Sequence, residues 1–232
     1  MVTKLAPAKY PQSQVRTWVR TQLCLMLEIS SLMPKAVKPG RSHTVRIIGG
    51  RLKGRRISID SEVIRPTADR VRETLFNWLD PYLRGARCLD MFAGSGALGI
   101  EAWSRGAESV SFVERDNRAA KQLRLRLAEF GCAAQVRQGD AAKVDFGGLG
   151  PFDIVFLDPP FDGPDMGNLC KLLESSTGLA AAALIYIEMH RKSEPPELPP
   201  GWEFIKERTA GQVRFALARR AVSAELQLSG AS

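Results

Sequence analysis

The feature that most constrains the fold is a glycine-rich segment, Cys88–Gly99, which reads Cys-Leu-Asp-Met-Phe-Ala-Gly-Ser-Gly-Ala-Leu-Gly. A short apolar run leads into the glycines, and a helix is expected to begin near Ala97. Glycine lets the backbone bend sharply and lets a ligand approach closely, because it has no Cβ. A strand, a glycine turn and a helix in this order mark the nucleotide-binding edge of an α/β sheet. The G-x-G-x-x-G spacing alone leaves a dehydrogenase open, since it is also the dinucleotide fingerprint.

A second motif, Asp158-Pro159-Pro160-Phe161, follows another apolar run and narrows the choice. An exocyclic base amine is a poor nucleophile, because its lone pair is delocalised into the ring. The Asp158 carboxylate and the Pro159 carbonyl, whose direction the proline ring restricts, can accept both N–H bonds and turn the lone pair toward a methyl donor. Phe161 offers a ring face for base stacking, which is worth about 1–3 kcal/mol. A dehydrogenase has no use for this motif. Together the two motifs resemble the class I S-adenosylmethionine (SAM)-dependent methyltransferases.

Predicted strands and helices alternate along most of the chain, as in a mostly parallel, doubly wound sheet. Strands are expected at Arg87–Met91, Ser109–Glu114, Ala134–Arg137, Phe152–Asp158, Leu184–Met189, Glu203–Glu207 and Val213–Ala218. Helices are expected at Ala97–Arg105, Asn117–Phe130 and Asp165–Ser175. The predicted fold class is therefore α/β, a Rossmann-like, seven-stranded sheet, with a small basic β-hairpin arm before it.

Four acidic residues end predicted strands or begin the loops that follow, at the edge where such sheets bind ligands. They are Asp90, Glu114, Asp140 and Asp158. Each alone is explained equally well as a helix cap or turn former, but four at equivalent positions favour a binding site. A ring of carboxylates suits the positive sulfonium of SAM better than a diphosphate. A carboxylate at Glu114 can also accept two hydrogen bonds from a ribose diol.

The resemblance to class I methyltransferases implies roles for these residues. For the cofactor SAM, it implies that the methionine part is held by Asp90 and the glycine loop, namely Phe92, Ala93, Gly94, Ser95 and Gly96. It implies further that Glu114 holds the ribose and Asp140 the adenine amino group. It implies that the target base is bound by Asp158, Pro159, Pro160 and Phe161. No metal is implied.

Basic residues number 33 and acidic residues 25, which gives a formal net charge of +8 and a pI near 9.6. This surplus suggests a polyanionic partner, although mildly basic soluble proteins are common. Eight basic residues lie between Lys35 and Arg56, a stretch without any acid, and Val45–Gly50 and Gly54–Ile59 are expected to pair as a hairpin. The candidate nucleic-acid contacts of this hairpin are Arg46, Arg51, Lys53, Arg55 and Arg56. The alternative is an edge hairpin that its charges keep soluble.

A helix is expected from Thr67 to Leu79, with Thr67 as its N-cap and Asp69 in the first turn, where the helix dipole favours an acid. Three arginines lie near its start and are further candidate contacts to the substrate. They are Arg65, Arg70 and Arg72. The alternative is that these side chains are merely solvated.

The four cysteines lie far apart without C-x-x-C spacing, and only two histidines occur. A zinc site, a disulfide framework and a histidine-based mechanism are therefore not expected. The longest apolar run near the N-terminus, Leu23–Leu27, is too short for a membrane span or a signal-peptide core. We expect a cytoplasmic protein, and we expect it to be a monomer because no long exposed apolar stretch demands a partner.

Four parts are expected along the chain. Residues 1–40 form an N-terminal extension, 41–64 the basic hairpin arm, 65–220 the methyltransferase domain and 221–232 a C-terminal tail. The first 32 residues show no periodicity that continues into the rest, and Met33 is a plausible start. The extension is interpreted as a disordered tail or as sequence upstream of the true start.

Several segments together resemble one particular family. They are Arg46–Gly50, Arg65–Leu79, Asp90–Gly96 and Asp158–Phe161, with Ala210–Val213 near the end. The chain resembles the RsmD family from about Val45 to Arg220, most specifically in Arg65–Leu79. This implies SAM-dependent methylation of N2 of one guanine in bacterial 16S ribosomal RNA, within a partly or fully assembled small subunit. The guanine rests on the resemblance and not on the chemistry of the residues.

Three other functions stay open on the residues alone. Adenine-N6 DNA methyltransferases share the Asp-Pro-Pro-aromatic motif, but they usually carry a sizeable target-recognition domain, and no insertion here is large enough. A SAM-binding ribosome assembly factor would act through RNA contact without turnover, and it would not need Asp158. NAD-dependent oxidation would use the glycine turn but not the second motif.

Overall fold

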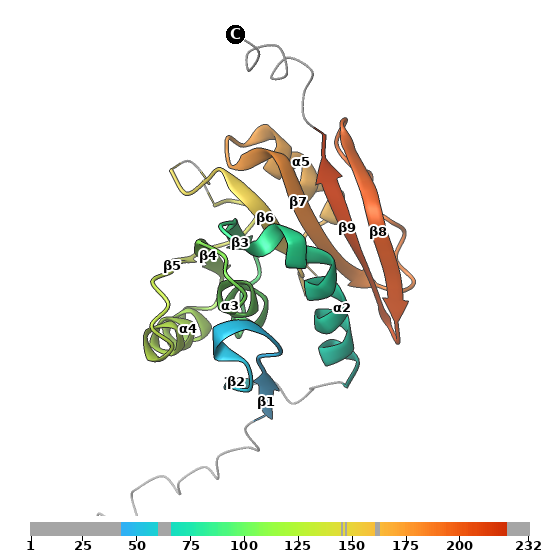
Figure 1. Cartoon of the computed structure of the whole chain (residues 1–232). Helices are drawn as coiled ribbons and strands as arrows, with labels where there is room; N and C mark the ends of the chain where they lie inside the picture. Colours follow the sequence, from blue (N-terminus) through green and yellow to red (C-terminus); the bar gives the residue numbers. More distant parts are fainter. Residues whose placement is uncertain (1–42, 60–65, 145, 147, 161–162, 222–232) are drawn as a thin grey trace, which may run out of the picture. The chain divides into compact units, whose positions relative to one another are not determined.

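A computed structural model describes residues 43–59, 66–144, 146, 148–160 and 163–221 (Figure 1). The chain divides into two compact units, Met1–Arg41 and Ser42–Ser232. The expected extension of residues 1–40 lies outside the described residues, as do residues 222–232 of the expected tail, Arg65 and Phe161. None of the helices in the described part of the chain is long and apolar enough to cross a membrane.

Seven strands form one sheet in the order β5-β4-β3-β6-β7-β9-β8. Their bounds are β3 Arg87–Asp90, β4 Ser109–Glu114, β5 Gln135–Gln138, β6 Phe152–Leu157, β7 Leu179–His190, β8 Trp202–Ala210 and β9 Val213–Arg220. The first five strands in this order, from β5 to β7, run parallel to one another. β9 is antiparallel to both β7 and β8. The predicted fold, a mostly parallel seven-stranded α/β sheet, is confirmed.

The helices are α2 Pro66–Leu83, α3 Ala97–Ser104, α4 Asn117–Glu129 and α5 Met166–Ser175. α2 begins at Pro66, so Thr67 lies inside its first turn, and the prediction of Thr67 as N-cap is wrong. Proline suits the first helical position because its fixed φ is helical and its missing N–H needs no partner there. α4 and α5 begin with aspartate caps, since Asp116 and Asp165 accept hydrogen bonds from backbone N–H groups in the first turns.

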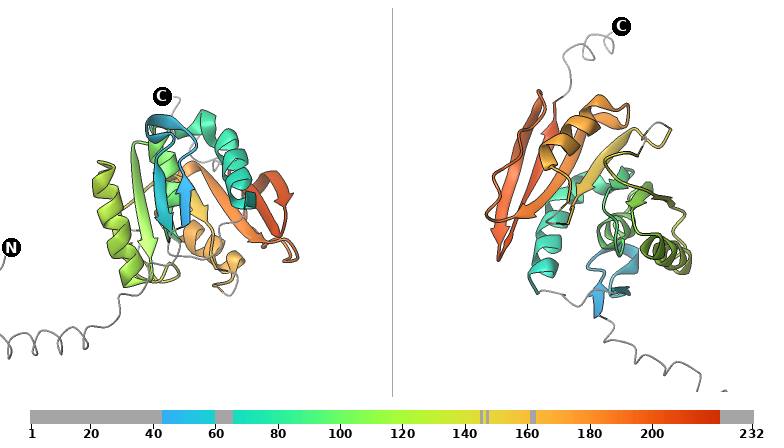
Figure 2. Two further views of the ribbon diagram at one scale, coloured as in Figure 1. Left: turned by 90° about the horizontal axis from the view of Figure 1, so that it is seen from below. Right: turned by 180° about the vertical axis from the view of Figure 1, so that it is seen from behind.

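Side chains alternate along the central strands between two hydrophobic cores, one on each face of the sheet. On β6, Ile154 and Phe156 belong to the first core, whereas Val155 and Leu157 belong to the second. α2, α3 and α4 cover the first core, and α5 covers the second (Figure 2). Strands buried on both faces need nearly continuous apolar sequence, which is why β6 and β7 are readable in the sequence.

The basic hairpin precedes the sheet and packs on its first face. β1, His43–Arg46, pairs antiparallel with β2, Arg56–Ile59, and a 3-10 turn at Gly50–Leu52 lies between them. The predicted hairpin is confirmed, but its strands are shorter than expected. Ile47 still bonds to Arg55 and Gly54 across the hairpin, whereas the backbone of residues 48 and 49 bonds to α3. Ile47 and Ile57 are fully buried in the first core. The hairpin is thus part of the folded body and not a free arm.

One buried carboxylate fastens this hairpin to α3. Glu101 is 0% exposed, and its two oxygens accept hydrogen bonds from the backbone N–H groups of Ile48 and Gly49, each at 2.7 Å. Its Oε1 also accepts from Arg105 Nε at 2.8 Å. Gly50 has φ +73°, and a Cβ there would lie 1.9 Å from the backbone oxygen of Ser104. Only glycine therefore permits this approach.

Candidate active site and nucleic-acid interface

The parallel strands bring the predicted acidic residues to one edge of the sheet. β3 ends at Asp90 and β4 at Glu114, while Asp140 and Asp158 follow shortly after β5 and β6. A first cavity of about 340 Å³ opens at this edge. Its lining includes Phe92, Gly94, Glu114, Asp140, Asp158 and Pro160. The structure thus gathers four of the predicted cofactor residues, together with the aspartate of the second motif, around one cavity.

Two glycines of the turn differ in what they do. Gly94 has φ +49° and Gly96 has φ +79°, conformations that other residues rarely adopt. A Cβ on Gly96 would lie 2.5 Å from a methyl group of Leu123, so this glycine lets the turn pack against α4. A Cβ on Gly94 would meet nothing nearer than 4.0 Å, on the side where this residue lines the cavity. Gly94 therefore keeps the cavity open, whereas Gly96 serves the packing behind it.

Glu114 joins the end of β4 to the glycine turn. Its Oε2 accepts from Gly94 N and its Oε1 from Asp116 N, each at 2.7 Å. A carboxylate oxygen has two lone pairs, so each oxygen keeps one for a ligand hydroxyl. The carboxylate is positioned before any ligand arrives.

Asp90 lies beneath the turn and not in the cavity wall. Its side chain is 3% exposed, and its Oδ2 accepts from the backbone N–H of Gly99 at 3.1 Å. Burial raises the pKa of Asp90 to about 7, although bonds from the Gly99 and Phe92 amides lower it in part, and Glu114 raises it. Asp90 thus supports the loop from below.

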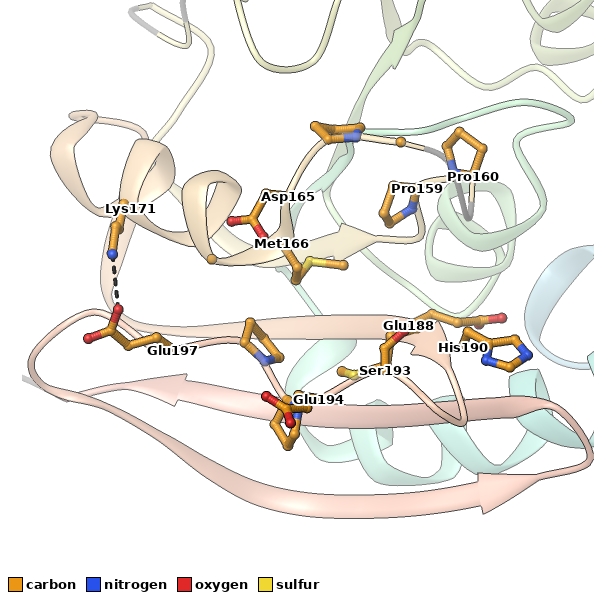
Figure 3. A pocket seen from close by; sticks show the side chains of 16 residues that line it. Pro159, Pro160, Asp165, Met166, Lys171, Glu188, His190, Ser193, Glu194 and Glu197 are labelled. Carbon is orange, nitrogen blue, oxygen red and sulfur yellow. Dashed lines mark hydrogen bonds and ion pairs between the residues drawn. The ribbon is translucent and has the colours of Figure 1, made fainter.

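A second, larger cavity of about 530 Å³ lies on the other side of the Asp158-Pro159-Pro160 segment (Figure 3). Its lining includes Pro159, Pro160, Met166, Glu188, His190 and Pro195. The two cavities share Pro160, Gly163 and Pro164. One short stretch of chain therefore separates two sites that could hold two reacting molecules.

Asp158 belongs to the first cavity, at its boundary with the second. The residue is exposed on its open side, yet the protein around the carboxylate raises its pKa well above the ordinary value by removing water, and Glu188 and Asp90 raise it further by repulsion. Glu188, two residues before the end of β7, accepts a hydrogen bond from Tyr186 Oη at 2.5 Å. Burial also raises the pKa of Glu188, and the Tyr186 bond offsets part of this. Within the described ranges, no group of His, Cys, Asp and Glu side chains could hold a metal ion.

The candidate RNA-binding residues are mostly on the surface. Exposed side chains are Arg46, Arg51, Lys53, Arg55, Arg56 and Arg70. The guanidinium carbon of Arg51 lies 3.3 Å from the ring centre of Trp103 on α3, and that of Arg55 lies 4.8 Å from the ring centre of Phe130. Cation–π contacts of this kind limit the motion of both arginines and leave their N–H edges free for phosphates.

Arg72 corrects the prediction for the start of α2. It is 7% exposed, and its Nη2 donates to the backbone oxygen of Arg46 and to Asp69, each at 2.9 Å. Burial lowers the pKa of Arg72, and the nearby carboxylates of Asp69 and Glu101 oppose this. The side chain fixes the hairpin to α2, so the expectation that it faces the substrate is wrong.

Two residues of these sites were not anticipated. Glu188 directly follows an apolar run, as Asp158 does, and this signal was available in Ile185-Tyr186-Ile187-Glu188. Glu101 sits inside an apolar helix, and its partners Ile48 and Gly49 lie far away in the sequence, so no local pattern indicates its role.

The fold is that of the class I methyltransferases. A SAM-dependent methyltransferase from Aquifex aeolicus has the same fold at 15% identity, with a TM-score of 0.53 over 68% of this chain and 94% of that one. The family model described as conserved hypothetical protein 95 matches residues 45–219.

Relatives of much higher identity define the family. Ribosomal RNA small subunit methyltransferase D of Escherichia coli K12 is 41% identical over 198 residues, covering 81% of this chain and 97% of that protein. The protein of the same name from Haemophilus influenzae is 42% identical over 191 residues, covering 80% and 98%. A solved structure from Escherichia coli is 40% identical, with a TM-score of 0.72 over 78% of this chain and 100% of that one. The chain belongs to the RsmD family, as its motifs predicted.

Proposed function

We propose that this protein is a SAM-dependent methyltransferase that modifies the exocyclic N2 of one guanine in 16S ribosomal RNA of the small subunit. The observation that carries the proposal is the pair of cavities on either side of Asp158-Pro159-Pro160, which share Pro160, Gly163 and Pro164. A methyl donor and its acceptor must lie close together for the transfer. Two cavities separated only by this short segment can hold them in that way. Membership of a family whose relatives carry the name of small-subunit rRNA methyltransferases supports the substrate.

The first cavity fits SAM in the chemistry of its walls. When bound, SAM supplies an electrophilic methyl group on a positively charged sulfur. The carboxylates of Glu114, Asp140 and Asp158 surround the cavity and favour a cation over a diphosphate. Glu114 keeps a lone pair on each oxygen for ribose hydroxyls, and Gly94 leaves the cavity open where a Cβ would project. Phe92, Ala93, Ser95 and Gly96 complete the proposed cofactor loop, with Asp90 supporting it.

The Asp158-Pro159-Pro160 segment binds the target base. Asp158 and the carbonyl of Pro159 accept the N–H bonds of the guanine amine, so that its lone pair points toward the first cavity. The amine becomes acidic as it gains the methyl group, so no strong base is needed, and the proton passes to Asp158 or to water. Phe161 is proposed to stack on the base, which must leave any helical stack first. The rate then depends mainly on alignment of the two reactants.

The hairpin holds the RNA backbone. Arg46, Arg51, Lys53, Arg55 and Arg56 carry exposed positive charge on a rigid, docked element, with Arg70 beside it and Arg65 proposed to join them. Such contacts set affinity and orientation but read little sequence. We propose that the substrate is the small subunit, partly or fully assembled, in the cytoplasm, and that the enzyme acts as a monomer.

The test is methylation of small subunits from a strain that lacks its own enzyme of this kind. The protein is incubated with methyl-labelled SAM and these subunits, with naked 16S RNA and duplex DNA in parallel, and the products are digested to nucleosides. Label in N2-methylguanosine, lost with Asp158→Ala while SAM binding persists, is the expected result.

Other outcomes point elsewhere. Label in N6-methyladenine would keep the methyltransferase and discard the guanine substrate. SAM binding without label in any nucleic acid would favour an assembly factor, and rescue of assembly by Asp158→Ala in a deletion strain would support that role.

A further inference from the structure

Glu188 stands beside Asp158 although the two residues are far apart in sequence. β6 and β7 are parallel neighbours, and the last registered pair is Leu157 with Ile187. Asp158 and Glu188 are the next residues along each strand. Each follows by two positions a residue of the first core, Phe156 on β6 and Tyr186 on β7, so both side chains fall on the same face of the sheet. Two carboxylates therefore meet at the wall between the cavities.

The surroundings of Glu188 leave one of its oxygens available. Oε2 accepts the hydrogen bond from Tyr186, which is itself fully buried. Among the described residues, no donor reaches Oε1, and no cation pairs with the carboxylate. Lys171, which lines the same cavity, pairs instead with Glu197 (Figure 3). A half-buried carboxylate without a cation is costly to the folded protein, which suggests that a ligand supplies the missing donor.

Guanine is the base whose edge matches two adjacent carboxylates. It presents the N1–H and the two N2–H bonds side by side, all donors. Adenine presents an acceptor at N1, so a carboxylate there would face a lone pair. Figure 3 shows the Glu188 side chain below Pro159 and Pro160 in this view, and all three residues line the second cavity.

We propose that Glu188 selects guanine by accepting the N1–H of the target base through Oε1, while Tyr186 positions the carboxylate through Oε2. Asp158 then accepts a hydrogen bond from N2, the atom that is methylated. Glu188 accepts one from N1, the neighbouring atom that distinguishes guanine from adenine. This inference rests on the proposed function and adds to it a residue that determines base specificity. Adenine is rejected because its N1 acceptor would leave the Glu188 carboxylate unpaired. An unpaired polar group discriminates between bases more strongly than a difference in shape does.

The first test compares variants on small subunits that the wild-type protein methylates. Glu188→Gln keeps the size of the side chain, but Tyr186 holds its oxygen, so its NH₂ group faces the N1–H of guanine. We expect kcat/KM to fall by about 10- to 100-fold, as for loss of a hydrogen bond to a charged group. Glu108→Gln, an exposed carboxylate that lines neither cavity, is the control and should stay within about twofold. SAM affinity should not change in either variant.

The second test changes the base and not only the protein. The modified guanine is located with the wild-type enzyme, and subunits are rebuilt with 2,6-diaminopurine there, which keeps the 2-amino group but has an acceptor at N1. Wild type should prefer guanine strongly. Glu188→Gln offers a donor to N1, so its preference for guanine should weaken by at least about tenfold or reverse. Tyr186→Phe should weaken the preference less, by roughly threefold, because Oε1 is kept but less well oriented.

The outcomes separate the two proposals. If wild-type protein leaves guanine unmethylated, the proposed function fails. If wild type methylates guanine, but Glu188→Gln and Tyr186→Phe both keep the wild-type preference over diaminopurine, the role of Glu188 alone is overturned. Since preference is a ratio within one variant, partial loss of folded enzyme does not affect it.

Discussion

Buried or crowded carboxylates lie in two regions of this domain, and the protein satisfies their hydrogen bonds in one region but not in the other. Glu101, at the junction of hairpin and α3, accepts bonds from two backbone N–H groups and from Arg105. At the wall between the cavities, Tyr186 donates a hydrogen bond to Glu188, and no side-chain donor among the described residues bonds Asp158. The protein itself supplies the hydrogen bonds that Glu101 accepts, whereas Asp158 and Glu188 keep lone pairs that a ligand can use.

The difference separates residues that build the molecule from residues that serve a ligand. A fully hydrogen-bonded buried carboxylate stabilises one arrangement of the chain, and its loss leaves orphaned donors. A repelling, under-bonded pair costs stability and is retained where a ligand compensates for it. Equivalent substitutions in the two regions should therefore have opposite effects on stability.

The largest effect is expected from Glu101→Gln. The amide can accept from only one of Ile48 N and Gly49 N, and its NH₂ group opposes the other donor. We expect a loss of about 3–5 kcal/mol in the free energy of unfolding, measured by urea denaturation. Glu108→Gln, an exposed neighbour, is the matched control and should change stability by less than about 0.5 kcal/mol. Equal small effects at both positions would contradict the role of Glu101 as anchor.

Gly50→Ala should come next. The new Cβ would collide with the Ser104 backbone oxygen, and φ at this position is +73°. We expect at least about 2 kcal/mol of destabilisation. Gly54→Ala makes the comparison sharp, because φ is +88° there but nothing lies within 4 Å of the Cβ, so it should cost only about 1 kcal/mol. If both variants lost the same stability, the close approach of hairpin and α3 would not matter.

Asp158→Asn tests the other region and should have the opposite sign. Because the pKa of Asp158 is raised in the folded protein, ionisation favours the unfolded state, and stability falls as the pH rises above the ordinary value of 3.8. Asp158→Asn carries no ionisable group at this position, so its stability does not fall for this reason as the pH rises. At pH 8 its stability should equal or exceed that of wild type, with the advantage vanishing at low pH, while methylation is lost. Thermal unfolding across pH measures this, and an advantage that grew toward acid pH would contradict it.

Arg51→Gln should have the smallest effect on stability, about 0.5 kcal/mol, from loss of the contact with Trp103. Its main effect should be on RNA binding. The slope of log affinity against log salt concentration should fall by about 0.7–0.9 for one lost phosphate contact. Arg208→Gln, an exposed arginine on the edge strand β8, should leave the slope unchanged. An unchanged slope for Arg51→Gln would remove that residue from the RNA interface.

The sheet was predictable because its central strands are buried on both faces and end in acids or glycines. β4 has the predicted bounds, whereas β7 begins at Leu179 and not at the predicted Leu184. The residues missed are Leu179–Ala183, a run rich in alanine, which carries little strand preference of its own. Pairing of Leu179 with Phe152 across the sheet supplies the preference that the local sequence lacks.

The site was predictable only where chemistry follows strand ends. Asp158 and Glu114 follow this rule, whereas Glu188 lies inside β7, two residues before its end. Arg72 was misjudged because its burial depends on Arg46 O, an acceptor that another element brings over the helix. Side chains whose partners lie on distant elements cannot be assigned from spacing along one helix.

The bond between Glu101 and the hairpin also makes two backbone protons into reporters. The amide hydrogens of Ile48 and Gly49 are held by a carboxylate that is fully shielded from water. They can exchange with solvent deuterium only when the hairpin leaves α3 or when the whole domain opens. Their exchange rates, set against those of β6 amides at the sheet centre, measure how often the hairpin detaches on its own. A ribosomal substrate gripped by the hairpin should slow exchange at these two positions while the rates in β6 stay the same.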